Sequence, residues 1–292
     1  MTETVARFSE ISSLYRAAFV DLWGCLHNGV RALPPAVAAL QQFRSKGGIV
    51  ILVTNSPRPR AGVERQLERF GVPRDCWDAI ATSGDSARAA MFIGAVGERV
   101  WHIGEKHDGG FFEPLKIIRD AKDITRVPLA EAEGIVCTGP FDPLADPSVN
   151  RADFLFAKNK GLKLLCANPD IVVDRGHVRE WCAGALAELY SEMGGESLYF
   201  GKPHPPIYDL SRLRLDAIEP GIGSDEIIAI GDGIHTDVKG ALGEGLHSLF
   251  ITGGLAAEET GTADGKDPDA KALRTFLARQ KIAPSYAISQ LR

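Results

Sequence analysis

The sequence predicts an α/β protein in which helices cover parallel β-sheets on both faces. Short apolar runs that end in small or polar residues alternate along the chain with stretches that have the apolar periodicity of helices. The runs are continuously apolar, which is typical of strands that are buried on both faces. The length of 292 residues exceeds the usual size of one compact domain and favours two.

The individual elements follow from these patterns. The first strand is expected at residues 16–20, and the next helix begins at Pro34, because proline is tolerated in a first helical turn. Gly47 and Gly48 end that helix. Further strands are expected at residues 49–53, 79–81, 99–103, 134–137, 163–167, 197–200, 227–230 and 248–251.

Three other segments are assigned as two helices and a loop. Residues 63, 67 and 70 are apolar and lie on one face of a helix that ends at Gly71. A helix is expected over residues 178–193, with Cys182, Leu186, Leu189 and Met193 on one face. The polar stretch 253–269 is expected to form a surface loop before a last helix.

Composition and charge exclude several classes of protein. The 33 Lys and Arg residues against 38 Asp and Glu give a net charge of -5, which argues against a nucleic acid or an anionic membrane as partner. Five cysteines without a C-x-x-C pair support neither a disulfide framework nor a zinc site. Neither a secretion signal nor a run of eighteen apolar residues is found. A reduced, cytoplasmic enzyme is expected.

Polar residues follow four of the predicted strands. Asp21 follows the first strand and Thr54 the second, whereas Lys202 and Asp232 follow two later strands, the last within Gly-Asp-Gly-Ile-His-Thr-Asp237. Parallel α/β sheets bind ligands at the carboxyl ends of their strands. If one sheet holds all four strands, these side chains converge.

Such a set suits phosphoryl transfer. Two carboxylates that face one point repel each other, and Mg²⁺, which prefers oxygen ligands, relieves that repulsion. Lys202 would neutralise phosphate oxygens, and the Thr54 hydroxyl with backbone N–H groups would complete the phosphate site. Asp21 could attack phosphorus and form an aspartyl-phosphate that water then hydrolyses.

The motifs, taken in order, resemble those of the haloacid dehalogenase (HAD)-like hydrolase superfamily, subclass IIA, and its NagD-like sugar phosphatases and p-nitrophenyl phosphatases. Asp21 matches the nucleophile of motif one, Thr54 matches motif two, and Lys202 in Gly-Lys-Pro matches motif three. Asp232 and Asp237 match motif four. Two further segments resemble ones typical of the subclass, Thr82-Ser83-Gly84 and Asn168-Pro169-Asp170.

The resemblance implies a Mg²⁺-dependent phosphatase of a small phosphorylated metabolite, such as a sugar phosphate. It implies a Rossmann-like, doubly wound parallel core from residues 1–84 and 199–292, with an α/β cap domain of the C2 type inserted at residues 85–198. By analogy with relatives, the protein is expected to form a homodimer through the cap. The implied metal ligands are Asp21, Asp232, Asp237 and the backbone carbonyl of Trp23. The residues expected to contact the substrate are Trp23, His27, Asn55, Ser56, Asn168 and Asp170.

At Trp23 the chain departs from the family pattern. Most phosphatases of the family have an aspartate there, two residues after the nucleophile, which protonates the leaving group. The metal ligand is retained, because it is a backbone carbonyl. The missing acid is expected to reduce the rate by about 10²–10⁴-fold.

Several of these residues also have a purely structural interpretation. Asp237 could cap a helix at residues 238–242, and Thr54 with Asn55 could form a turn at the end of a strand. Lys202 could be a loop cation. Trp23 could be a core aromatic residue or a wall of the pocket.

The polar residues near the expected pocket also have two interpretations each. His27 could replace the missing acid, because its ordinary pKa suits proton transfer near neutrality, or it could be a solvated loop residue. Asn168 and Asp170 could face the substrate or form an Asx turn around Pro169.

Two functions compete with the phosphatase because of Trp23. The first is a catalytically weakened relative that binds a phosphorylated ligand as a sensor or scaffold. The second is cleavage of a carbon–halogen or carbon–phosphorus bond at Asp21. The Gly-Asp…Thr-Asp loop argues against a dehalogenase, because that chemistry needs no metal.

Overall fold

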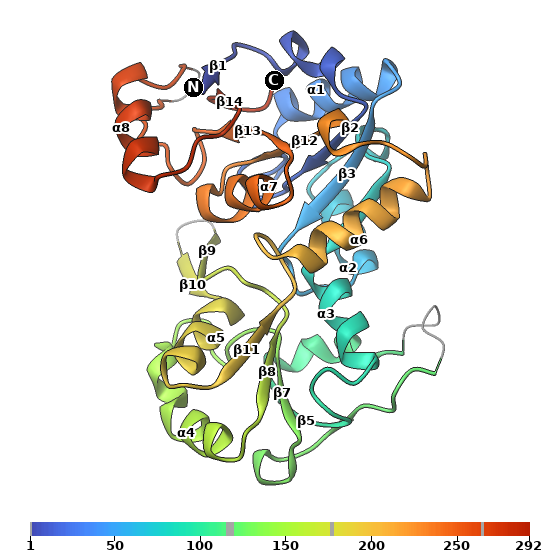
Figure 1. Cartoon of the computed structure of the whole chain (residues 1–292), viewed down its shortest axis with the longest axis vertical. Coiled ribbons are helices and arrows are strands. Elements are labelled where there is room, and N and C mark those ends of the chain that lie inside the picture. The colour runs from blue at the N-terminus through green and yellow to red at the C-terminus, as the bar shows by residue number, and fades with distance from the viewer. Residues whose placement is uncertain (1, 115–119, 176–177, 264–265) are drawn as a thin grey trace. The chain divides into compact units, whose positions relative to one another are not determined.

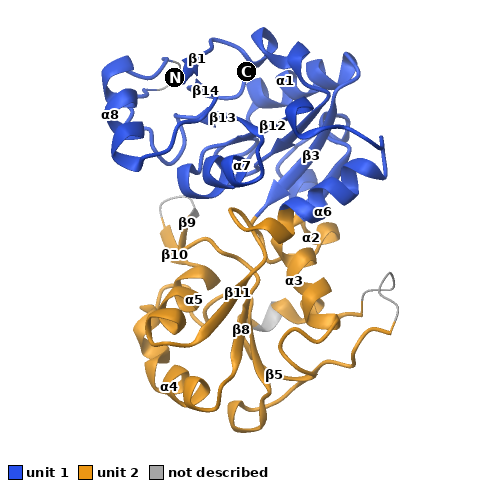
Figure 2. Ribbon diagram, viewed as in Figure 1, with its two compact units in different colours: residues 1–54, 64–81, 208–292 blue, residues 55–63, 82–207 orange. Residues whose placement is uncertain are grey.

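The chain forms two compact units in the computed structural model, which describes residues 2–114, 120–175, 178–263 and 266–292 (Figures 1 and 2). Unit 1 consists of residues 1–54, 64–81 and 208–292, and unit 2 consists of residues 55–63 and 82–207. The chain therefore passes between the units four times. The expected assignment of residues 85–198 to a cap stays a prediction.

Unit 1 is built on a seven-stranded sheet (Figure 1). Its strands are β1 (Glu3–Thr4), β2 (Ala17–Val20), β3 (Ile49–Thr54), β4 (Ala79–Thr82), β12 (Ile227–Gly231), β13 (His247–Ile251) and β14 (Tyr286–Ile288). They lie in the order β1-β14-β13-β12-β2-β3-β4, and the pairs from β1 through to β3 are parallel. From the central strands β2 and β12 the chain extends outward in opposite directions, which confirms the doubly wound, Rossmann-like order.

The helices around this sheet begin and end largely where the sequence predicts. They are α1 (Pro34–Ser45), α2 (Arg60–Arg69), α6 (Pro205–Asp216), α7 (Lys239–Gly243) and α8 (Ala270–Gln280). Helix α1 starts with two prolines and buries Val37, Leu40 and Phe43. A Cβ atom at Gly48 would lie 2.5 Å from the Phe43 ring, so the glycine that follows α1 lets this ring pack against the backbone.

Unit 2 contains a second, five-stranded sheet. Its strands are β5 (Arg99–Ile103), β6 (Thr125–Arg126), β7 (Gly134–Cys137), β8 (Lys163–Cys166) and β11 (Glu196–Tyr199). They are parallel and lie in the order β11-β8-β7-β5-β6. The helices of this unit are α3 (Ser83–Phe92), α4 (Arg151–Asn159) and α5 (Ala183–Glu192).

Successive side chains of the second sheet point to opposite faces and form two cores. On one face, Ile135 packs with Phe154 of α4 and Leu186 of α5. On the other face, Val136 packs with Met91 of α3. Unit 2 is therefore itself an α/β layer structure with helices on both faces, as the alternating pattern predicts.

The predicted helix over residues 178–193 is wrong in its first turn. The chain instead forms an antiparallel hairpin of β9 (Val172–Arg175) and β10 (Val178–Trp181), and α5 begins only at Ala183. The Trp181 N–H donates to the Pro143 carbonyl, 2.8 Å away, so the residue before Cys182 pairs outside the helix. Val178 lies four residues before Cys182, so the apolar spacing of α5 continues back into β10, and no glycine or proline between them marks the boundary.

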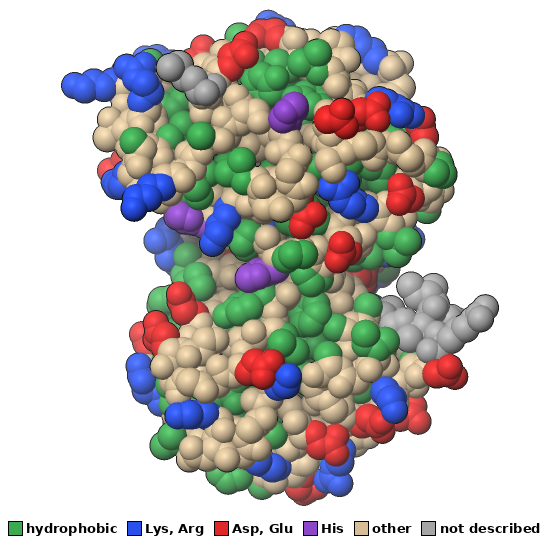
Figure 3. All heavy atoms as spheres, viewed as in Figure 1, with side chains coloured by type: hydrophobic (Ala, Val, Ile, Leu, Met, Phe, Trp, Pro, Cys, Tyr) green, Lys and Arg blue, Asp and Glu red, His purple; other side chains and the backbone are tan. Residues whose placement is uncertain are grey.

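The surface adds two observations. On the face shown in Figure 3, acidic and basic side chains are interspersed within each unit. Within the described ranges, no helix is both long enough and apolar enough to span a membrane.

Candidate active site

The strand order of unit 1 reverses between β2 and β12, and each of these strands ends at an aspartate. The strands pair in register at Val20 and Ile230, and the Asp21 N–H donates to the Ile230 carbonyl, 2.8 Å away. Asp21 and Asp232 therefore leave the sheet side by side. Ligands of doubly wound sheets bind at this position.

Three carboxylates meet at this edge of the sheet. Asp21, Asp232 and Asp237 each offer an oxygen atom within 4.8 Å of the others. Their side chains are only 6–8% exposed. Three buried like charges at such distances repel strongly, and a cation would offset that repulsion. The structure thus brings together the three predicted metal-ligating carboxylates.

The donor set fits Mg²⁺. This ion takes oxygen ligands at about 2.0–2.1 Å, so two opposite ligands lie about 4 Å apart. The span of the three oxygens, at most 4.8 Å, is close to that value. Mg²⁺ also retains several waters, so one carboxylate can bind through a water molecule.

Two glycines enclose the carboxylate of Asp232. A Cβ atom would lie 2.2 Å from its Oδ2 atom at Gly24 and 2.0 Å from it at Gly254, much closer than real contacts. The Leu255 N–H donates to the same oxygen, 3.0 Å away. The backbone of two loops thus fixes Asp232, and the sequence analysis missed both. The segment expected to be a plain surface loop, 253–269, supplies one of them.

Hydrogen bonds within its own loop hold Asp237, which does not cap the helix at residues 238–242 as the structural alternative proposed. It lies within a π-helical turn, Ile234–Val238, that runs into α7 and begins after Gly233. Its Oδ2 atom accepts hydrogen bonds from the Gly233 N–H at 3.1 Å and the Thr236 hydroxyl at 3.3 Å. The capping interpretation is therefore wrong, because the helical backbone already extends on both sides of Asp237.

Thr54 is the last residue of β3, which pairs with β2. Its side chain is buried, and β3 continues two residues past Leu52, the partner of Val20. Thr54 therefore lies at the same edge of the sheet as Asp21.

The loop after β2 places Trp23 against His27. The two rings meet edge to face with centroids 5.5 Å apart, and a Cβ atom at Gly29 would lie 2.5 Å from the Trp23 ring. Gly29 has a φ of +83°, which glycine adopts without strain. Trp23 is thus half-buried within its own loop.

His27 is buried, so the solvated-loop interpretation is wrong. Its Nδ1 atom accepts a hydrogen bond from the Gly29 N–H, 3.1 Å away, and its ring also meets Phe70 edge to face. Burial lowers the pKa of His27 to about 4. At neutral pH the ring is therefore uncharged and is a poor general acid.

The other predicted residues form a second group inside unit 2. The Asn55 side chain bonds the backbone of Lys202 and the carboxylate of Asp170. Asn168 accepts a hydrogen bond at Oδ1 from the Asp170 N–H, 3.0 Å away, which is an Asx turn. The Ser56 hydroxyl accepts a hydrogen bond from the Arg58 N–H at 3.3 Å.

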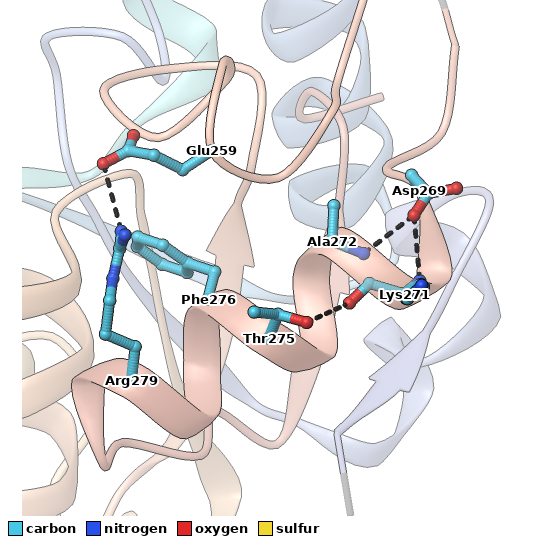
Figure 4. A pocket seen from close by; sticks show the side chains of 7 residues that line it. All are labelled: Glu259, Asp269, Lys271, Ala272, Thr275, Phe276 and Arg279. Atoms are coloured by element: carbon cyan, nitrogen blue, oxygen red, sulfur yellow. Dashed lines mark hydrogen bonds and ion pairs between the residues drawn. The ribbon is translucent and has the colours of Figure 1, made fainter.

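A separate hollow of about 370 Å³ lies on the surface of unit 1 along α8 (Figure 4). Two of its charged side chains are paired with each other, because Arg279 meets Glu259 at 3.4 Å, and a third, Asp269, caps the helix. None of the predicted site residues lines it. The hollow is therefore separate from the group of three carboxylates.

Two family models match the chain. The model of haloacid dehalogenase-like hydrolases matches residues 18–116, and a model of HAD-hydrolase-like proteins matches residues 199–276. The first includes Asp21 and Thr54, and the second includes Lys202, Asp232 and Asp237. A comparison with curated proteins finds no match.

Solved structures are similar to most or all of the chain. A hydrolase of the haloacid dehalogenase-like family from Brucella suis is 39% identical, with a TM-score of 0.83 over 99% of this chain and 100% of the other. A possible sugar phosphatase of the HAD superfamily from Cytophaga hutchinsonii is 17% identical, with a TM-score of 0.73 over 99% and 98%. A glycerol phosphate phosphatase from Mycobacterium tuberculosis, in complex with magnesium, is 22% identical, with a TM-score of 0.64 over 87% and 74%.

Proposed function

Since the chain belongs to the haloacid dehalogenase-like hydrolase family, we propose that it is a Mg²⁺-dependent phosphatase of a small phosphorylated metabolite. The observation that carries this proposal is the buried group of Asp21, Asp232 and Asp237 at the reversal point of the sheet. A glycerol phosphate phosphatase of similar fold is in complex with magnesium, and another protein of similar fold is described as a possible sugar phosphatase. Both support a phosphorylated metabolite as the substrate.

The reaction uses Asp21 as the nucleophile. One carboxylate oxygen attacks phosphorus, the ester bond to the leaving group breaks, and an aspartyl-phosphate forms. Water then attacks the phosphorus of this intermediate, releasing phosphate and regenerating the carboxylate. Lys202 and the Thr54 hydroxyl bind the phosphoryl oxygens as negative charge redistributes.

The metal would be held by Asp21, Asp232 and Asp237, with the backbone carbonyl of Trp23 as a further oxygen ligand. When bound, Mg²⁺ supplies positive charge that offsets the repulsion among the carboxylates and the phosphoryl group. The Leu255 N–H and the closely packed backbone at Gly24 and Gly254 keep Asp232 in place for this role.

The first test is the change of Asp21 to Asn. The amide cannot attack phosphorus but still offers an oxygen to a metal, so turnover of p-nitrophenyl phosphate should fall below detection while Mg²⁺ still binds. Asp216→Asn, at an exposed position of the same unit, is the matched control and should keep wild-type turnover. Activity of the wild type should disappear with EDTA and return with Mg²⁺. Residual activity in Asp21→Asn comparable to that of the control would remove Asp21 from the reaction.

The catalytically weakened alternative rests on Trp23, which cannot protonate a leaving group. His27 is a poor substitute acid, because burial lowers its pKa to about 4. We therefore expect turnover to depend steeply on the acidity of the leaving group, with aryl phosphates cleaved much faster than alkyl or sugar phosphates.

A series of phosphomonoesters measures this dependence. Trp23→Asp should raise alkyl phosphate turnover by up to about 10²–10⁴-fold if the new carboxylate reaches the leaving oxygen. His27→Gln should change the slope of the series little. A flat series would mean that another group donates the proton, and binding without turnover of any ester would favour the sensor or scaffold.

A further inference from the structure

The side chain of Asn55 contacts the main chain of Lys202 at two points. The Lys202 N–H donates to Asn55 Oδ1 at 2.7 Å, and Asn55 Nδ2 donates to the Lys202 carbonyl at 3.1 Å. The residues are 147 positions apart in the sequence, and each is only 4% exposed. The carboxamide thus pairs with one residue of backbone as a neighbouring strand would, just beyond the end of β11 at Tyr199.

A third contact fixes the orientation of this carboxamide. Asn55 Nδ2 also donates to Asp170 Oδ1, 2.8 Å away. An amide nitrogen has two hydrogens, and the Lys202 carbonyl and Asp170 accept one each. Exchanging the oxygen and nitrogen of the amide would set a donor against the Lys202 N–H, so only one orientation satisfies every group. Both donors of Asn55 are used within the protein.

The acceptor on Asp170 is itself held in place. The Asp170 N–H donates to Asn168 Oδ1 at 3.0 Å, and its carbonyl accepts from the Gly184 N–H at 3.1 Å. A Cβ atom at Gly184 would lie 2.4 Å from that carbonyl oxygen, so the first turn of α5 packs directly on this segment. These contacts therefore hold the backbone of Asp170 in place within unit 2.

The backbone beside Lys202 is closely packed against Asn55. A Cβ atom at Gly201 would lie 2.5 Å from Asn55 Oδ1 and 2.8 Å from Ser83 Oγ. Only a residue without a side chain allows the chain to approach Asn55 closely enough for the pairing with Lys202.

We propose that Asn55 is a positioning residue for Lys202: its carboxamide, oriented by Asp170, fixes the Lys202 backbone and thereby the place from which the ammonium group meets the phosphoryl group. The proposal rests on the proposed function, in which Lys202 binds phosphoryl oxygens. It changes the expected role of Asn55 from a substrate ligand to a support for one. Asn55 also directly follows Thr54, so the same residue links two expected phosphate-binding positions along the chain.

The test is a double-mutant cycle with Asn55→Ala and Lys202→Met. A misplaced binding group can cost up to ~10²-fold, so Asn55→Ala should weaken competitive inhibition by inorganic phosphate and lower kcat/KM by roughly 10- to 100-fold. In the Lys202→Met background, Asn55→Ala should change neither constant further, because its effect is exerted through Lys202. The Mg²⁺ concentration for half-maximal activity should stay within about twofold of wild type, because the metal-binding carboxylates belong to unit 1.

The matched control is Asn150→Ala, which removes another buried asparagine of unit 2 that donates to a backbone carbonyl, that of Pro147. It should leave phosphate inhibition and kcat/KM unchanged. If Asn55→Ala does not fold, Asp170→Ala serves instead: it frees one Asn55 donor and should weaken phosphate inhibition in the same direction by a smaller factor. An equal loss on Asn55→Ala with and without Lys202 would show that Asn55 contacts the substrate itself and would overturn the proposal. Unchanged kinetics in a destabilised Asn55→Ala would also overturn it.

Failure of the proposed function gives a different result. In that case the wild type hydrolyses no phosphomonoester, and calorimetric titration of wild type and variants with inorganic phosphate in the presence of Mg²⁺ replaces the kinetics. The same double-mutant cycle is then built from binding constants. Coupling between Asn55 and Lys202 supports the positioning role of Asn55. Additive effects of the two substitutions, or a wild type that binds no phosphate, contradict it.

Discussion

At the residue scale, the contacts of Asp232 show how much of the site depends on residues without side chains. The sequence marks Asp232 by its motif, but Gly24 and Gly254 acquire their roles only when two distant loops close on one carboxylate. A glycine can mark a place where another group approaches the backbone closely. The signal does not say what is approached, because that depends on the folded arrangement of the loops.

Gly254→Ala tests this enclosure. The added methyl group would lie 2.0 Å from Asp232 Oδ2, so the carboxylate or the backbone at residue 254 must shift, and either change disturbs the group of three carboxylates. We expect the Mg²⁺ concentration for half-maximal activity to rise by about 10–100-fold, as is usual when the groups that orient a metal ligand are lost. Gly243→Ala, where a Cβ atom meets nothing within 4 Å, is the control and should leave it unchanged. Equal Mg²⁺ requirements in the two variants would contradict the enclosure.

Some site residues can be placed from the strand pattern alone, whereas the surroundings of others depend on packing in the folded protein. Asp21, Asp232 and Asp237 could be predicted to converge, because parallel strands end at a common edge. The burial of His27 could not, because it depends on contacts with partners such as Trp23, Gly29 and Phe70. Sequence position alone carries no information about those contacts.

At the element scale, the loop from Asp21 to Leu33 has a defined structure held by its own hydrogen bonds. The Gly24 N–H donates to the His27 carbonyl at 2.9 Å, and the Leu33 N–H donates to the Leu26 carbonyl at 2.9 Å. Sequence patterns for helices and strands do not describe such a loop. Its stability depends on an uncharged His27, because Nδ1 must accept the Gly29 N–H.

Stability should therefore fall in mild acid. The pKa of His27 is about 4 in the folded protein and 6.5 ordinarily, so the unfolded chain binds this proton first as the pH decreases. The contribution is complete above pH 6.5 and is lost between about pH 6.5 and pH 4, by about 3 kcal/mol at most. Urea unfolding across this range should show a shallower slope for His27→Gln than for wild type.

Two further histidines define the comparison. His235→Gln, at an exposed position, should keep the wild-type slope. Burial also lowers the pKa of His102 to about 4, so part of the slope should survive in His27→Gln. A His27→Gln profile that overlays the wild type would show that His27 titrates without effect on the fold.

The elements that sequence reasoning misread share a physical cause. Residues 178–181 continue the apolar spacing of α5 but pair with β9, because hydrogen bonds to a neighbouring segment outweigh local propensity. The π-helical turn at Ile234–Val238 has the same origin, since Asp237 bonds back to Gly233. In both places a contact with another residue determines the backbone conformation, and apolar periodicity does not reveal that contact.

At the scale of the whole molecule, the three carboxylates proposed to bind Mg²⁺ lie in one unit and the Asn55–Lys202 pairing in the other. Mg²⁺ alone should therefore stabilise the two units unequally. At a concentration one hundred times its dissociation constant, a ligand adds about 2.7 kcal/mol to the state that binds it.

Hydrogen exchange with and without Mg²⁺ measures this difference. Amides near Asp21, Asp232 and Leu255 should exchange more slowly with the metal, and those of β5, β7 and β8 should change little. Asp232→Asn should remove most of the protection. Equal protection of both sheets by Mg²⁺ would show that the units open as one cooperative body, and the unequal stabilisation would be refuted.

The pairing of β1 with β14 has a consequence for how copies of this protein meet one another. An open strand edge presents unpaired N–H and C=O groups that can recruit a second chain and begin aggregation. Here β14 is covered by the exposed two-residue strand Glu3–Thr4, and the Phe8 N–H bonds the Arg292 carbonyl close by. The margin of the sheet on this side is thus shortened to two residues. A change that detached Glu3 and Thr4 would uncover β14 as a template for self-association, although every group of the active site would remain in place.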